Sequence, residues 1–319
     1  MIDALSDAFT AVQAWLFEQA VQPVLYATGQ MRYQEQGYVA TEWFLLGAIQ
    51  VIVLFLVLRP IEALAPAERW PDRRATRVDV LYTLLNRLGI IPLVIFLLVS
   101  PLFDALAAQL RSFGFTPFNL DALWPGVTDV PLVTFVLYLV ALDFVDYWVH
   151  RGQHAVRWWW ELHAVHHSQR QMSFWTDDRN HLLDAVLRDV IKASVALAIG
   201  AEPAQFVMLI IVTRMLQSLE HANVAWTFGP AGRLLVSPVF HRRHHSIGVG
   251  HEGRFHGCNF AVLFPAWDML FGTADYGRTI EPTGIRDQLP QPAGQERDYG
   301  RGFWAQQWLG LQRMLNPAR

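Results

Sequence analysis

Three apolar stretches of this 319-residue chain are long enough to cross a lipid bilayer as helices. They cover residues 42–58, 88–110 and 130–148. A hydrocarbon core of about 30 Å needs about 20 mostly apolar residues in a helix. Only 17% of the residues are charged, against about 25% in ordinary soluble domains. The stretches therefore predict an integral membrane protein built on helices.

Two further apolar stretches, 182–200 and 203–219, are separated by Gly-Ala-Glu-Pro and predict a tight helical hairpin. The first of them contains four charged residues, which makes it the weakest candidate for a span. These are Asp184, Arg188, Asp189 and Lys192. We expect its first turns to lie at the membrane interface or to face the protein interior.

Both ends of the chain have the pattern of amphipathic helices. Residues 1–26 carry Asp3, Asp7 and Glu18 where a signal peptide would be positively charged, so we expect a helix lying on the membrane instead. Residues 276–302 contain three prolines and several charges and predict an irregular segment. Residues 303–315 predict a closing amphipathic helix.

The distribution of arginine predicts the orientation in the membrane. The loop 59–87 holds six arginines, whereas 104–129 holds only Arg111. Cytoplasmic loops carry an excess of basic residues, so the 59–87 loop is expected in the cytoplasm. Counting spans onward from it places the chain near His150 and near His221 on the same, cytoplasmic side.

All twelve histidines fall between His150 and His256, and nine of them form four short groups. These are His150 and His154; His163, His166 and His167; His221; and His241, His244 and His245. Residues three and four apart share a helix face, so each group can present its imidazoles together. Imidazole suits iron, zinc, copper or nickel, and a catalytic zinc needs only three protein ligands. Nine imidazoles therefore indicate two metal ions.

The three remaining histidines have more ordinary explanations. His181 precedes an apolar run, where it can cap a helix or support a ligand, and His251 and His256 suit polar positions near an interface. Asp146 lies one turn and Asp143 two turns before His150 in an apolar helix, where they can orient ligands or pair with Arg151 or Arg157. The single cysteine, Cys258, excludes an internal disulfide and a four-cysteine iron–sulfur cluster.

The histidine groups and their surroundings resemble the sterol desaturase/fatty acid hydroxylase superfamily of integral-membrane non-haem di-iron oxygenases. The similar segments are Asp146 to His154, Trp160 to Ser168, His221 to Asn223, His241 to Ser246, Asn259-Phe and Trp267 to Thr273. The chain departs from the family where Gln217 stands in place of a histidine found in some relatives. It also carries extra histidines at His251 and His256.

The resemblance implies an all-α integral membrane protein with about four to five transmembrane or re-entrant helices and a helical cytosolic cap holding a di-metal site. It divides the chain into membrane helices (1–129), a catalytic domain (130–275) and a tail (276–319). The nine grouped histidines would bind two Fe ions, for which zinc can substitute in preparations. Possible supporting residues or extra ligands are Asp146, His181, Gln217, Asn223, His256, Asn259 and Asp268.

The function implied by the resemblance is hydroxylation or desaturation of a lipid with O2. Sterols, fatty acyl chains, ether lipids and carotenoids are all candidate substrates. The sequence has no haem-attachment, dinucleotide-binding or iron–sulfur motif, so a separate electron-donor protein or reductase must supply electrons. A net charge of −3 argues against nucleic acid as a partner. A membrane zinc hydrolase and a non-catalytic membrane metal-binding protein are the alternatives.

Overall fold

The computed structural model describes residues 2–201, 203–290 and 296–316, and within these it is built from helices. The described residues contain no strands, only two isolated β-bridges, Pro66 to Val224 and Ser246 to Thr283. The predicted all-α class is confirmed.

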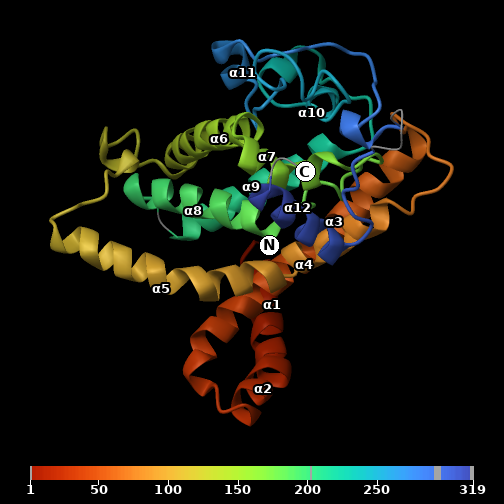
Figure 1. The fold of residues 1–319 in the computed structure, drawn as a ribbon. Coiled ribbons are helices and arrows are strands. Elements are labelled where there is room, and N and C mark those ends of the chain that lie inside the picture. Colours follow the sequence, from red (N-terminus) through yellow and green to blue (C-terminus); the bar gives the residue numbers. More distant parts are fainter. Residues whose placement is uncertain (1, 202, 291–295, 317–319) are drawn as a thin grey trace.

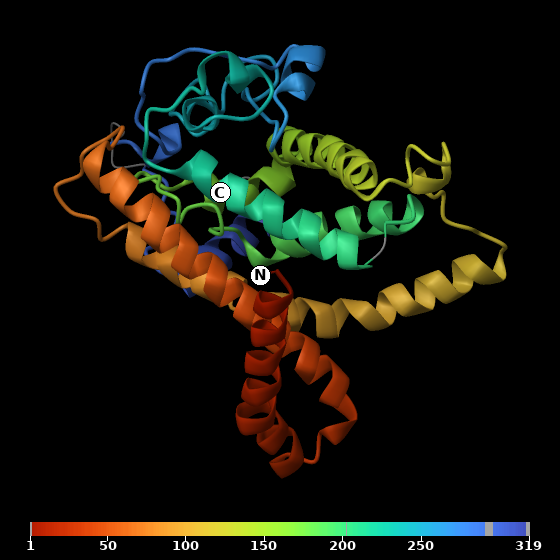
Figure 2. The same ribbon diagram turned by 180° about the vertical axis from the view of Figure 1, so that it is seen from behind.

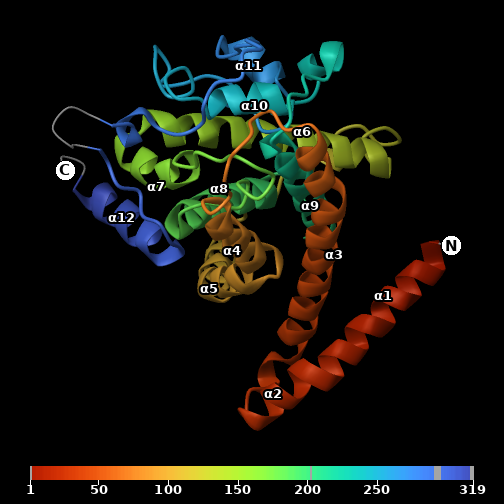
Figure 3. The same ribbon diagram turned by 90° about the vertical axis from the view of Figure 1, so that its right-hand side faces the viewer.

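The first helices form an arm that extends from the rest of the molecule (Figure 3). Helix α1 (Ile2–Leu16) leads through a π-helical turn (Phe17–Val21) into α2 (Gln22–Ala27). After the 3-10 turn Met31–Tyr33, α3 (Gln34–Leu64) runs back along them. The helix expected near the N-terminus is present; its position on the membrane stays a prediction.

Helix α4 (Thr76–Arg87) crosses α3 at very close range. A Cβ atom on Gly47 would lie 1.6 Å from the carbonyl oxygen of Arg87, so only glycine permits this crossing. Gly89, in the left-handed region at φ 80°, then turns the chain into α5 (Ile90–Ser112), which lies along one side of the molecule (Figure 1).

The centre of the molecule is formed by α6 (Pro131–Ala155), α8 (Leu182–Ala198) and α9 (Pro203–His221). Figure 2 shows α8 and α9 beside α6, and each of them packs on α6. Tyr138 and Leu142 of α6 pack on Ala196 and Leu209 in one core cluster. The 3-10 turn Leu120–Ala122 in the α5–α6 connection lies against this cluster.

A layer of short helices and irregular segments covers one end of this bundle. It contains α7 (Arg157–His167), α10 (Pro238–His244) and α11 (Ala266–Phe271), with 3-10 turns at Gly229–Arg233 and Arg286–Gln288. A core cluster joins α6 to the layer: Tyr147, Val236, Phe240, Phe260 and Ala261. The predicted closing helix is α12 (Phe303–Leu315), which packs on α7.

Three helical segments in the described part of the chain are long and apolar enough to cross a bilayer. They are Met31–Leu64, Ile90–Ser112 and Pro131–Ala155. Only 6% of the most apolar window of α5 is buried in the protein, so its leucine and phenylalanine side chains need another apolar environment. Helices α8 and α9 are not among the three, and a total of four to five spans stays a prediction.

Candidate metal centre

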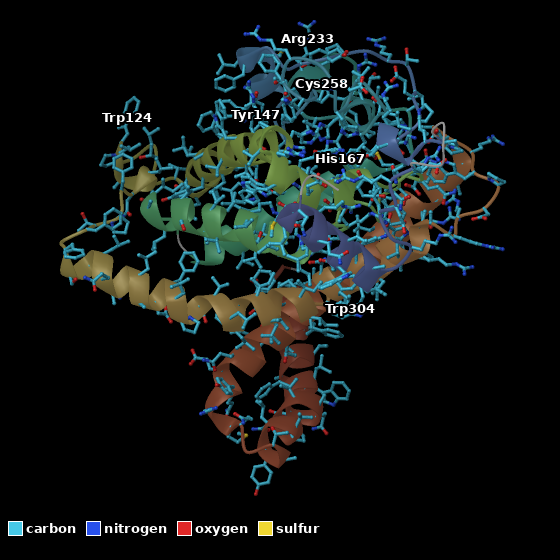
Figure 4. The ribbon with its side chains drawn as sticks, in the orientation of Figure 1. Trp124, Tyr147, His167, Arg233, Cys258 and Trp304 are labelled. Atoms are coloured by element: carbon cyan, nitrogen blue, oxygen red, sulfur yellow. The ribbon has the colours of Figure 1, made fainter. Side chains whose placement is uncertain are left out.

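The helix ends bring the nine grouped histidines into one buried region. His150 and His154 lie in the last turns of α6, and His221 is the last residue of α9. The others lie in α7 or in and just after α10. None of the nine is more than 7% exposed. Figure 4 shows His167 in the interior, below the layer that carries Cys258 and far from Trp124.

The nine imidazoles form two groups, each with its ligand atoms within 4.8 Å of one another. The five-histidine group is His150, His154, His163, His167 and His244. The four-histidine group is His166, His221, His241 and His245. Each group has enough nitrogen ligands for one ion.

Each His-x-x-His-His motif contributes to both groups. His163 and His167, four residues apart, enter the five-histidine group, while His166 enters the other. The second motif does the reverse, because His241 and His245 enter the four-histidine group and His244 the five-histidine group. The sequence predicts that all three histidines of a motif act together. In the structure the two histidines four residues apart share one group, and the middle histidine of the motif enters the other group.

An irregular segment, 256–260, orients three members of the five-histidine group. Alternate backbone carbonyls of His256, Cys258 and Phe260 accept hydrogen bonds from the Nδ1 atoms of His154 (3.1 Å), His244 (2.7 Å) and His150 (2.8 Å). His256 and Asn259 have left-handed φ values of 59° and 56°, and the turns of this segment direct the three carbonyls toward one cluster. Cys258 thus acts through its backbone.

Three other histidines are oriented from different elements. His166 Nδ1 donates to the carbonyl of Arg179 at 3.2 Å, and His221 Nδ1 to that of Gln217 at 2.8 Å. His163 Nδ1 lies 3.1 Å from the Asp184 carboxylate. Such contacts fix the ring and its tautomer.

The tautomers show that the groups fit metal ions. A carbonyl can only accept, so His166 and His221 carry their hydrogen on Nδ1 and a lone pair on Nε2. Their Nε2 atoms nevertheless face each other at 3.2 Å. Two lone pairs at this distance repel unless a cation lies beside both. The donor set matches imidazole-preferring ions, including iron.

Burial keeps these imidazoles neutral. Removal from water, followed by the charges of neighbouring histidines, lowers the pKa of His166, His167, His241, His244 and His245 well below the ordinary value of 6.5. Neutral imidazole is the form that binds metal.

The carboxylates of α6 do not contact the histidines. Asp146 pairs with Lys192 of α8 at 2.7 Å, so it meets neither a histidine ring nor the arginines considered as its partners. Asp143 accepts from the backbone N–H groups of Leu263 and Phe264 and from the Trp267 indole. Both aspartates therefore connect α6 to neighbouring elements, Asp146 to α8 and Asp143 to the segment 263–267.

Three further residues predicted to support the ligands, His181, Gln217 and Asn223, make different contacts around the histidine groups. His181 caps α8 by accepting from the Leu183 N–H, and its Nε2 donates to the Gln307 carbonyl. Gln217 meets His221 through its backbone carbonyl, whereas its side chain lines a neighbouring cavity. The Asn223 side chain forms hydrogen bonds with the backbone of Glu68.

The remaining candidates shape the 256–260 segment. Asp268 accepts from the N–H groups of Phe260 and Ala261. Asn259, with a left-handed φ of 56°, donates to the Phe240 carbonyl. His256 is exposed and contributes its backbone carbonyl. His251 stacks near His154 at 5.9 Å between ring centroids and donates from Nε2 to the Gly284 carbonyl.

Asp184 is the functional candidate that the sequence reasoning missed. Besides His163, it accepts from Gln153 and from the Trp159 indole, and it is 1% exposed. The signal was present: a carboxylate in the first turn of an apolar stretch is costly unless it is used. A second buried network joins Arg87 to Asp177 (2.7 Å) and Asp178 (2.8 Å).

The fold and the site define a membrane protein whose helix ends bring together two histidine groups that could each hold a metal ion. Residues 135–273 match the fatty acid hydroxylase family. An ornithine lipid hydroxylase of Rhizobium tropici is 29% identical over 264 residues, 78% of this chain and 75% of the relative. These matches confirm the predicted resemblance: over residues 135–273, somewhat under half of its length, the chain is similar to the fatty acid hydroxylase family.

Other relatives match the histidine-bearing half. Human alkylglycerol monooxygenase is 30% identical over 46% of this chain and 31% of its own length. Methylsterol monooxygenase 1-3 of Arabidopsis thaliana is 24% identical over 54% of this chain and 58% of its own. The chain thus spans less than two thirds of these two relatives. No solved structure gives a significant match.

Proposed function

We propose that this protein is a membrane-bound di-iron oxygenase that hydroxylates or desaturates a lipid. The observation that carries the proposal is the pair of buried histidine groups, with five and four converging imidazoles, at the ends of apolar helices. The relatives named as lipid hydroxylases and monooxygenases support it.

We assign one iron to each group, held by the nine histidines. Bound iron would supply the activation of O2 that breaks an unactivated C–H bond, which side chains alone cannot do. The chain's own residues would fix the imidazole tautomers through carbonyls and Asp184, and burial would keep water out. Hydroxylation would place one oxygen atom of O2 in the C–H bond and release the other as water, consuming two electrons and two protons.

The electrons would come from a separate donor protein or reductase on the cytoplasmic side. The arginines of the 59–87 loop support this orientation of the histidine groups. A zinc hydrolase would need three protein ligands and an open position, fewer than either group offers. A metal-transport protein would need ligands spaced along the spans, whereas these lie together at helix ends.

The proposal is tested by comparing lipids of cells that express the chain with those of cells expressing His166→Ala. We expect lipids that have gained one oxygen atom or lost two hydrogens with the native chain only. Mass spectrometry of total lipid extracts provides the measurement. Equal lipid profiles for the native chain and the variant, with both proteins present in the membrane, would contradict the proposal.

A further inference from the structure

A cavity of about 490 Å³ lies between α5, α8 and α9 beside the metal centre. Its size is typical of small-molecule sites, about 300–1,000 Å³. Gln217 and Asp146 line it, and each lies one helical turn before a histidine, His221 and His150 respectively. The cavity therefore approaches both histidine groups from the side of the bilayer helices.

One wall of this cavity is apolar and belongs to α5. Its apolar lining side chains are Ile91, Pro92, Ile95, Phe96, Val99 and Phe103, and Ser100 and Asp104 of the same helix also line the cavity. The same helix exposes Leu98 (74%) and Leu102 (68%) on its other faces, so α5 separates the cavity from an apolar exterior. This wall suits a hydrocarbon chain.

The opposite wall carries ion pairs of both signs. Lys192 pairs with Asp146 at 2.7 Å, Arg214 with Asp178 at 3.0 Å and Arg188 with Asp189 at 3.5 Å. The three cationic side chains keep 16%, 24% and 32% of their surface exposed. All six residues line the cavity, so charges of both signs are accessible to a ligand.

We propose that this cavity binds the lipid substrate and that the substrate carries a zwitterionic head group. This inference rests on the function proposed above. The head group lies on the charged wall and its hydrocarbon chain on α5. A sterol or carotenoid would cover the ion pairs with apolar surface and remove their contact with polar groups, which is costly. Because charged residues lie one turn from the histidines, oxidation falls on the head-group side of the lipid.

Tandem mass spectrometry of the oxidised lipid tests this placement. We expect the added oxygen in the head-group fragment of a zwitterionic lipid. An oxygen far along an acyl chain, or on a sterol or other uncharged lipid, would overturn the inference and leave the oxygenase assignment intact. If no lipid is oxidised, the oxygenase assignment fails. The binding of lipid probes to the purified chain then tests whether the cavity is a lipid site.

Binding is measured with the purified, metal-loaded full chain and two probes, dihexanoyl phosphatidylethanolamine and dihexanoylglycerol. We expect the zwitterionic probe to bind at least about tenfold more tightly, because its charged head group can form hydrogen bonds with the charged side chains of the cavity wall. Arg188→Gln should remove most of this preference, and Arg111→Gln, at the far end of α5, should keep it. Equal affinity of the native chain for both probes would overturn the inference.

The hydrocarbon wall is tested by a matched pair on α5. Val99→Trp places an indole inside the cavity, whereas Leu98→Trp places one on the exposed face. We expect Val99→Trp to weaken binding of a long-chain phosphatidylethanolamine and Leu98→Trp to leave it unchanged. The same affinity in both variants would show that the lipid lies elsewhere.

Discussion

At the scale of single residues, the hydrogen bonds of the histidine Nδ1 atoms determine how the imidazole rings are oriented. Six of the nine grouped histidines direct Nδ1 to a carbonyl or carboxylate, which leaves Nε2 free for a metal ion. The spacing of the histidines predicted which residues gather. It could not predict their partners, because five of these six partners are backbone carbonyls, which any residue type provides.

Asp184 gives the sharpest test at this scale. Asp184→Asn replaces the charged acceptor of His163 Nδ1 with a neutral one and keeps the side-chain shape. We expect the metal affinity to fall about 10–100-fold, the usual effect of losing such a partner. Competition with a chelator measures it. Asp189→Asn on the same helix is the control, and equal affinities in the two variants would rule out the assigned role.

At the scale of elements, the apolar pattern of the sequence predicts where the helices lie along the chain. It does not predict how the helices cross one another. The stretches 88–110 and 303–315 closely match α5 and α12. The third apolar stretch ended at residue 148, but α6 continues to Ala155 and so carries His150 and His154. The irregular 256–260 segment has no periodic signal, and its role depends on contacts with α6 and α10 that only the fold creates.

The segment 256–260 can be loosened without touching a histidine. Asn259 holds a left-handed backbone and bonds the Phe240 carbonyl. We expect Asn259→Ala to weaken metal binding, because the carbonyls that orient His150, His154 and His244 lose their support. Asn259→Gly restores the backbone freedom but not the side-chain bonds, so it should have an intermediate affinity. Native affinity in the alanine variant would contradict this account.

The α3–α4 crossing predicts a strong effect at Gly47. Gly47→Ala forces its methyl group into the Arg87 carbonyl. We expect the free energy of unfolding to fall by about 1–3 kcal/mol or more, as is typical of overpacking. The thermal unfolding midpoint in nanodiscs measures the loss. Gly37→Ala on the same helix meets only side-chain ends at 3.1 Å or more and should be mild. Similar midpoints would show that α3 and α4 do not cross so closely.

At the scale of the whole molecule, burial of the histidines links stability to pH. The pKa of His166, His167, His241, His244 and His245 lies well below 6.5 in the fold because burial opposes protonation. Below about pH 6.5 the unfolded chain binds protons that the folded chain does not, so stability falls as pH falls. We expect the unfolding midpoint of metal-free protein to drop steeply from pH 7 to 5. A flat profile would mean that these side chains meet water.

The class of the protein was predictable from the sequence, because the apolar stretches form helices and the spaced histidines gather in the fold. The arrangement of nine imidazoles as five and four was not, because it depends on the relative rotation of α6, α7, α9 and α10. The sequence could not predict the cavity beside α5 either, because its two walls come from helices that are far apart in the sequence.

The metal content of purified protein tests the central assignment most directly. Protein from iron-supplied cells should contain two iron ions per chain, one for each histidine group. His166→Ala, which removes a ligand of the four-histidine group, should retain the ion of the five-histidine group and lose most of the other. One tightly bound zinc ion per chain, unchanged in the variant, would contradict the di-iron account.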